Sequence, residues 1–249
     1  MDRTFFAEQL TAVRAAVAAG MGCNPASFDA DQLTIVDRPD SAPWPYVAMV
    51  ATFGVGTVAS VDPEYRAFVE TLPAASPRSA LSPAFLAPLA VEARRRGQEG
   101  TTTPATLFWA LSEPSAAVEF PADLELRSVD RDWMAAEQAS GRFKNAVGEP
   151  DIAARAERNR FGFALVDAAG EPVAVGGVFD TLGLHEIGVD VVKTRQGQGL
   201  APVVVAAAAQ AILEADGAPF YACEATNIRS QRTALSCGFI PVASDAFVS

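Results

Sequence analysis

Residues 191–201 read VVKTRQGQGLA and join an apolar strand pattern to an apolar helix pattern. The first turn of a helix has unpaired backbone N–H groups and the positive end of the helix dipole, which together bind phosphate oxygens. Gly197 and Gly199 carry no side chain that would keep a pyrophosphate away from those amides. Lys193 and Arg195 add positive charge beside them. The stretch therefore predicts a phosphate-binding loop; the alternative is an ordinary strand-to-helix turn that needs glycine for its dihedral angles.

The hydrophobic periodicity around this loop predicts an α/β fold. The expected strands are 124–129, 161–167, 172–180, 184–192, 218–225 and a last strand from Phe239, and the expected helices are 131–140, 151–160, 200–215 and 227–237. The resulting order is β-α-α-β-β-β-α-β-α-β. Hairpin-linked strands followed by a crossover helix predict a mixed, predominantly antiparallel sheet with helices on both faces.

The first half of the chain predicts a smaller α+β domain of unknown role. Its pattern indicates a helix over 4–19, strands at 33–36, 46–52 and 55–61, a helix after Asp62-Pro63, and a helix over 82–96. A Pro-bracketed stretch at 112–121 is the best candidate linker, so we expect domains at 1–121 and 122–249. The first domain could complete an acceptor site, act as a lid, or be a degenerate copy of the second.

The composition excludes several classes of protein. The 249 residues include 30 Asp and Glu against 19 Lys and Arg, for a net charge of −11, which argues against nucleic acid and anionic membranes as partners. The longest uncharged apolar run, 200–209, is shorter than the roughly 20 residues that span a bilayer. The start of the chain lacks the basic region of a signal peptide. We therefore expect a soluble cytoplasmic protein.

The cysteines and the single histidine argue against a metal site. The three cysteines form no Cys-x-x-Cys pair, which is typical of reduced thiols in the cytoplasm. With His185 as the one histidine, a zinc site has too few ligands. The loop at 191–201 also lacks both Gly-Lys-Ser/Thr and Gly-x-Gly-x-x-Gly, so it is neither a nucleoside-triphosphate loop nor a dinucleotide loop.

Two motifs resemble the GNAT superfamily of acyl-CoA-dependent N-acyltransferases. Residues 196–201, QGQGLA, fit its Gln/Arg-x-x-Gly-x-Gly/Ala signature. Asn227-Ile228-Arg229-Ser230, followed by Gly238-Phe239, is similar to the Asn-x-x-(Ala/Ser)…Gly-Phe ending of the superfamily. The resemblance covers about half of the chain, residues 122–249. The first half is more distantly similar to the extensions of two-part bacterial members, including antibiotic N-acetyltransferases of the zwittermicin-resistance kind.

The resemblance implies acetyl-CoA as co-substrate. Its pantetheine would pair with the strand at 184–192 as an added strand does, its pyrophosphate would bind the amides of 197–201, and a backbone N–H near Val191 would polarise the thioester. Asn227 would contact the pantetheine or acyl end. The residues assigned to the co-substrate are Val191, Val192, Gln196, Gly197, Gln198, Gly199, Leu200, Ala201 and Asn227.

The general base is sought among carboxylates near the expected thioester. Strand alternation puts Glu186 and Asp190 on one face, away from the apolar residues. Because some relatives use a glutamate early on this strand, Glu186 is the leading candidate, Glu224 at the end of the neighbouring strand is second, and Asp190 is third. Each could instead attract a cationic acceptor or be a solvated surface acid. His185 points the opposite way and is interpreted as structural.

The general acid departs from the pattern of the relatives. They often place a tyrosine seven residues after the motif asparagine, where this chain has Ala234. Tyr221 could substitute, although an ordinary half-buried aromatic is the more common role for such a residue. The thiolate could also leave unprotonated, since a free thiol has a pKa of about 8.5. A covalent route through Cys223 or Cys237 is less expected because neither has a histidine partner.

These observations predict an N-acetyltransferase that moves an acetyl group directly to a primary amine of a small molecule in a ternary complex. The alternatives are a protein or peptide N-acyltransferase and a catalytically silent acyl-CoA-binding module. The expected partner is a small-molecule amine, and a homodimer is an alternative to a monomer; no metal, nucleic acid or membrane is expected.

Overall fold

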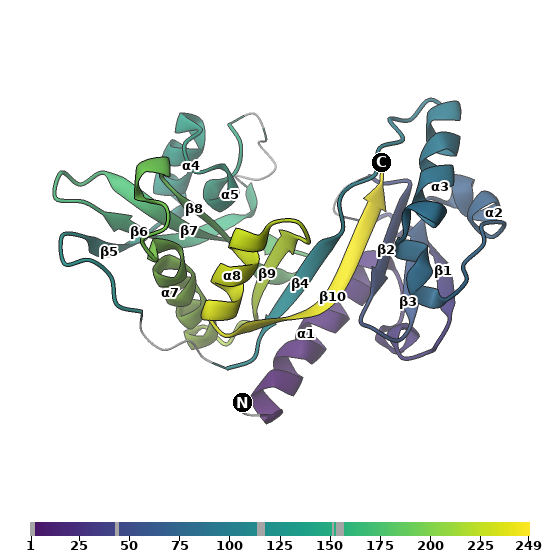
Figure 1. Ribbon diagram of the computed structural model, residues 1–249, viewed down its shortest axis with the longest axis horizontal. Coiled ribbons are helices and arrows are strands. Elements are labelled where there is room, and N and C mark those ends of the chain that lie inside the picture. The colour runs from purple at the N-terminus through teal and green to yellow at the C-terminus, as the bar shows by residue number, and fades with distance from the viewer. Residues whose placement is uncertain (1–2, 43–44, 114–117, 151, 153–156) are drawn as a thin grey trace. The chain divides into compact units, whose positions relative to one another are not determined.

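The computed structural model describes residues 3–42, 45–113, 118–150, 152 and 157–249 (Figure 1). The chain forms two compact units. The first unit comprises residues 1–9, 109–222 and 228–240, and the second comprises residues 10–108, 223–227 and 241–249. We expected one boundary, after residue 121. The division by contacts differs, because the chain passes between the units several times and the C-terminal segment belongs to the second unit.

The first unit contains a sheet whose strands follow the predicted pattern. Their spatial order is β5 (Glu125–Val129), β6 (Asn159–Val166), β7 (Pro172–Thr181), β8 (Leu184–Val191) and β9 (Pro219–Glu224). The first four are antiparallel neighbours, and β9 runs parallel to β8. This arrangement confirms the predicted mixed, mostly antiparallel sheet. An unpredicted strand, β4 (Thr106–Leu111), includes the buried Trp109.

Helices cover both faces of this sheet. They are α4 (Arg131–Ser140), α5 (Lys144–Val147), α7 (Leu200–Glu214) and α8 (Ile228–Ser236). Helices α4 and α5 pack in a core cluster with Ala164 and Val166, whereas α7 packs with Leu165. Because successive strand residues point to opposite faces, these two clusters lie on opposite sides of β6.

The helix expected over 151–160 is described only in part. Residues 151 and 153–156 lie outside the described residues, Glu157 and Arg158 are helical, and the last two residues, Asn159 and Arg160, already belong to β6. The buried Asn159 side chain donates a hydrogen bond from Nδ2 to the carbonyl oxygen of Val147 at 2.8 Å. This long-range contact favours the strand over the local helical pattern.

Two glycines in a row of three let the backbone of α5 lie directly on the sheet. Gly162 pairs with Gly177 and Gly177 with Gly188, so they form a row across β6, β7 and β8. A Cβ on Gly177 would lie 1.9 Å from the carbonyl oxygen of Ala146, and one on Gly188 would lie 2.0 Å from that of Asn145. A larger residue at Gly177 or Gly188 would push α5 away, whereas a Cβ on Gly162 would lie 2.7 Å from the carbonyl oxygen of Gly176 in the sheet itself.

The second unit is the expected α+β assembly. Its strands β1 (Leu33–Asp37), β3 (Thr57–Val61), β2 (Ala48–Thr52) and the C-terminal part of β10 (Phe239–Val248) are neighbours in that order. The β1–β3 pair is parallel and the other pairs are antiparallel. Its helices are most of α1 (Arg3–Met21), α2 (Arg66–Val69) and α3 (Pro83–Arg95). Side chains of α3 such as Phe85 and Leu89 fill its core.

Candidate functional site

The loop between β8 and α7 has the open geometry that phosphate binding needs. A short 3-10 turn at Lys193–Arg195 follows the strand. Gly197 (φ +80°) and Gly199 (φ +74°) are in the left-handed region, and a Cβ added to either would meet nothing within 4 Å. Gly199 precedes α7 without any side-chain cap, so no side chain occupies the amides of the first turn. These two glycines serve the backbone conformation and leave the space beside it clear.

Gln196 connects this loop to the second motif. Its Nε2 donates to the carbonyl oxygen of Val191 at 3.2 Å, and its Oε1 accepts from Nη1 of Arg229 at 3.1 Å. The structure thus brings together two motifs that lie 33 residues apart. Beside it, Arg195 Nε donates to Gln198 Oε1 at 3.0 Å, which orders the loop from within.

Strands β8 and β9 are paired only near their starts. The pairs are His185 with Pro219 and Glu186 with Phe220. Within the described part of the chain, residues 187–191 of β8 have no strand partner on this edge, although they pair fully with β7 on the other. An exposed strand edge of this kind can accept an extended ligand through main-chain hydrogen bonds.

Asp190, a candidate base in the sequence, has a structural role. Its Oδ2 accepts hydrogen bonds from the backbone N–H groups of Asn145 at 2.7 Å and Ala146 at 3.1 Å, and its Oδ1 accepts one from Asn145 Nδ2 at 2.7 Å. Three donors fix the carboxylate against the start of α5, which argues against Asp190 as a base. Glu186, two residues before Gly188 on the same face, is half-buried and remains the leading candidate.

Tyr221 is almost completely buried on β9. Its side chain is 1% exposed, its hydroxyl lies 2.7 Å from Ser230 Oγ, and its ring is 5.8 Å from that of Phe239. It follows Phe220, the residue paired with Glu186. This burial fits a core aromatic, and a role as general acid stays a prediction. Ala234, at the position of the usual tyrosine, is fully buried in α8.

Glu224 is the last residue of β9 and Asn227 lies in the turn before α8, both in the segment that belongs to the second unit. The Asn227 N–H donates to the Glu224 carbonyl oxygen at 2.9 Å. The exposed Glu224 side chain accepts from Thr226 Oγ1 at 3.3 Å. Their proposed roles, base and co-substrate contact, stay predictions.

The cysteines are free, and Cys237 is unsuited to nucleophilic catalysis. Its side chain is buried. Burial raises the pKa of its thiol to about 11, despite an opposing hydrogen bond with Ser236. A thiol with this pKa is protonated at neutral pH, so the structure argues against an acyl-cysteine at this position.

His185 lies beside an ion pair. Its Nδ1 is 3.2 Å from Asp180 Oδ1, and Asp180 also pairs with Arg160. Burial raises the pKa of Asp180, but the hydrogen bond and charge of Arg160 outweigh it, so that pKa lies below its usual value. These contacts support the structural interpretation of His185.

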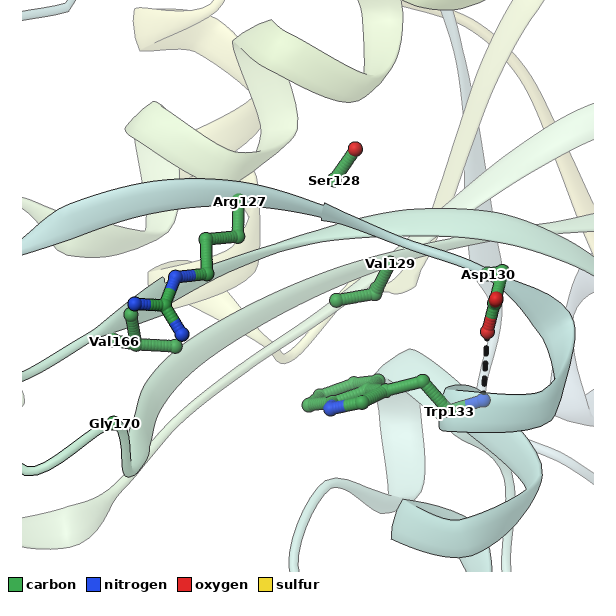
Figure 2. Close-up of a pocket in the computed structure, with 7 residues that line it drawn as sticks. All are labelled: Arg127, Ser128, Val129, Asp130, Trp133, Val166 and Gly170. Atoms are coloured by element: carbon green, nitrogen blue, oxygen red, sulfur yellow. Dashed lines mark hydrogen bonds between the residues drawn. The ribbon is translucent and has the colours of Figure 1, made fainter.

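A pocket of about 260 Å³ lies at the edge of the same sheet, between β5, α4 and the β6–β7 turn (Figure 2). It is lined by Arg127, Ser128, Val129, Asp130, Trp133, Val166 and Gly170. Figure 2 shows the Trp133 ring extending from α4 beneath Val129, toward the side where Arg127 and Val166 lie. No motif in the sequence pointed to these residues.

Two kinds of site are absent from the described residues. No helix there combines the length and the apolar character needed to cross a membrane. No three side chains of the metal-binding types come together in that part of the chain.

Comparisons with known proteins agree with the two motifs. The family model for the GNAT acetyltransferase domain matches residues 106–240, more than half of the chain. No curated protein matches the sequence. The comparisons give no support to the finer resemblance to antibiotic N-acetyltransferases of the zwittermicin-resistance kind.

Several solved structures are similar to this chain at low sequence identity. A GNAT-family acetyltransferase from Colwellia psychrerythraea is 17% identical, with a TM-score of 0.45 over 59% of this chain and 56% of that one. A Drosophila protein is 18% identical, with a TM-score of 0.51 over 66% and 57%. A GCN5-related N-acetyltransferase-like protein from Streptococcus suis is 13% identical, with a TM-score of 0.50 over 98% and 100%.

This chain covers less than two thirds of the length of the Colwellia and Drosophila proteins. At these identities a structural similarity is evidence for the fold alone. The family match concerns the segment that holds β8, the glycine loop, α7 and α8. The chain belongs to the GNAT family of acetyltransferases, acyltransferases that use acetyl-CoA as co-substrate.

Proposed function

We propose that the protein transfers an acetyl group from acetyl-CoA directly to a primary amine of a small molecule. The observation that carries this proposal is the loop at 196–201. It combines two open left-handed glycines, an uncapped helix N-terminus and a preceding strand with a free edge. Together these supply donors for a pyrophosphate and for an extended pantetheine chain.

The loop and β8 have separate tasks in this proposal. The amides from Gly197 to Ala201 bind the pyrophosphate, and Gln196 holds them in place through Val191 and Arg229. The unpaired edge of 187–191 binds the pantetheine, and a backbone N–H near Val191 polarises the thioester carbonyl. Bound acetyl-CoA supplies the activated acyl group.

Glu186 is the proposed base. An ammonium must lose a proton before its nitrogen can attack, directly or through a water molecule. Glu186 is a half-buried carboxylate on β8, in the strand that leads to the loop. Glu224 is the second candidate. Tyr221 is the candidate acid that protonates the departing CoA thiolate. The alternative is that the thiolate leaves without being protonated.

The net charge supports the acceptor class. A charge of −11 is compatible with a cationic amine and favours its approach over that of an anionic substrate. A peptide amine would benefit from the same attraction, so a protein or peptide acyltransferase is the second candidate. We further propose that the reaction takes place in the cytoplasm, where free cysteines such as the three here stay reduced.

Calorimetry with a pair of matched glycine variants tests the co-substrate site. Gly199→Glu puts a carboxylate where the pyrophosphate would bind. Gly183→Glu is the control, because Gly183 (φ +78°) is equally strained and equally open but lies in the β7–β8 turn. We expect micromolar acetyl-CoA binding in the wild type and in Gly183→Glu, and at least about a tenfold loss in Gly199→Glu. Equal binding by both variants would contradict the placement.

A thiol-release assay with a panel of amines and lysine peptides tests the transfer. Release with small amines supports the proposal, whereas release with peptides alone favours the second candidate. Acetyl-CoA binding without release from any acceptor would instead indicate a silent binding module. Free CoA and a folded Gly199→Glu protein serve as negative controls.

A further inference from the structure

The pocket in Figure 2 is separate from the glycine loop. Val166, which lines the pocket, belongs to the core cluster under α4 and α5. Leu200, the first residue of α7 after the glycine loop, packs with Leu165 in the cluster on the opposite face. The pocket is therefore on the other side of the sheet from α7, and the proposed acetyl-CoA contacts do not account for it.

The pocket combines an apolar surface with hydrogen-bond donors. Val129 and Val166 form its apolar part and the indole of Trp133 its flat wall. Within the described residues, the indole N–H of Trp133 has no acceptor. The guanidinium of Arg127 uses Nη2 to bind Glu125 Oε2 at 2.6 Å, and its other N–H groups have no acceptor in that part of the chain.

The nearby carboxylates already have partners. Glu125 pairs with Arg127, and that hydrogen bond and charge hold the pKa of Glu125 below its usual value. Asp130 caps α4 by accepting the Trp133 backbone N–H at 2.9 Å. Among the described residues, the lining groups that still lack a partner include the remaining N–H groups of Arg127 and the indole N–H of Trp133, and these donors suit the oxygens of an anion.

The walls are held in place by contacts outside the pocket. Arg142 Nη2 donates to Glu137 Oε1 at 2.8 Å and its Nη1 to Glu171 Oε2 at 3.3 Å, which ties the β6–β7 turn to α4. The Asp130 cap fixes the backbone of Trp133. A pocket that is formed in advance loses little entropy on binding.

We propose that this pocket binds a small organic carboxylate with a flat apolar body. The body packs on Trp133, Val129 and Val166, and the carboxylate accepts hydrogen bonds from Arg127 and from the Trp133 indole N–H. The volume of about 260 Å³ is below the roughly 300–1,000 Å³ typical of pockets for drug-sized ligands, so the ligand is small. Binding here does not depend on acetyl transfer.

NMR of the indole N–H groups tests this proposal directly. The chain has three tryptophans, and a Trp133→Phe variant identifies the signal of Trp133. The probe is benzoate, and benzylamine, of similar shape but opposite charge, is the control. We expect benzoate to shift the Trp133 signal saturably at millimolar concentration while the other two indole signals stay in place, and benzylamine to cause no such shift.

Arg127→Gln and a matched variant complete the test. Arg127→Gln removes the charge and an exposed ion pair of small worth, and we expect at least about a tenfold loss of benzoate affinity. Arg131→Gln, four residues further on and outside the lining, should bind like the wild type. The proposal is overturned by an unsaturable Trp133 shift, by equal shifts with benzylamine, or by unchanged affinity in Arg127→Gln. The undisturbed indole signals report that each variant is folded.

Discussion

Two sets of glycines in the first unit do opposite things. Gly197 and Gly199 face empty space, and their positive φ angles are what the turn into α7 requires. Gly177 and Gly188 have ordinary strand angles, and backbone carbonyls of α5 fill the space a side chain would take. A glycine in a sequence thus indicates either open space for a ligand or close packing of another backbone. The atoms that surround it in the folded structure decide between the two.

The covered glycines should be the more costly to replace. Gly177→Ala brings a Cβ against the Ala146 carbonyl oxygen, a backbone atom that can move only if α5 moves with it. We expect unfolding free energy to fall by about 3 kcal/mol, measured by urea denaturation. Gly183→Ala, in open space, is the control. Equal losses in the two variants would show that close packing is not what distinguishes them.

The two acids on either side of Gly188 should separate activity from stability. Glu186→Gln should lower kcat about 100-fold if Glu186 is the base, and should lower the unfolding free energy less than Asp190→Ala does. Asp190→Ala leaves the donors at the start of α5 without their acceptor, and we expect it to cost about 2 kcal/mol of stability. Steady-state kinetics and denaturation of both variants check this. Loss of stability in Glu186→Gln together with full activity would reverse the assignment.

Replacing a glycine that faces open space should lower the unfolding free energy less. Gly199→Ala meets no atom, so its penalty is the left-handed backbone alone, about 1 kcal/mol. Gly183→Ala should lose the same amount, since its φ is +78°. Acetyl-CoA binding should nevertheless weaken in Gly199→Ala only. If the two variants also bind alike, Gly199 serves the turn and not the ligand.

The smallest expected change in stability concerns Glu92 of the second unit. It is a loss at acid pH that should leave the first unit unaffected. Glu92 accepts hydrogen bonds from Arg95 and Arg96, which lower its pKa from 4.5 to about 2. A lowered pKa stabilises the folded state above pH 4.5, and that contribution is lost as the pH falls toward 2. The loss should be small, because Arg95 is mostly exposed and water screens the pair. Acid denaturation of wild type and Glu92→Gln, monitored in each unit by hydrogen exchange, measures it.

The local patterns predicted most of the fold. The strands from β5 to β9, the glycine turn and α7 follow from hydrophobic period and from the position of Gly199, all of which lie within short windows of sequence. The contact between Gln196 and Arg229 was not predicted as such, but the two motifs that carry them were. In each case the signal lies next to the element it specifies.

Features that depend on distant partners were missed. Asp190 was a candidate base because the alternation of its strand places it on the face away from the apolar residues. The Asn145 groups that donate hydrogen bonds to its carboxylate lie 45 residues earlier in the sequence. Asn159 was expected in a helix, and its bond to Val147 is again long-range. The pocket at Trp133 draws its walls from three separate elements. None of these relations leaves a period or a motif in the sequence.

The hydrogen bonds of Gln196 also have an evolutionary consequence. A neutral amide can donate to Val191 and accept from Arg229 at once. An arginine at position 196 would keep the first bond but set two guanidinium groups against each other. We therefore expect substitutions at 196 and 229 to be coupled, with an arginine at 196 tolerated best where position 229 is not an arginine.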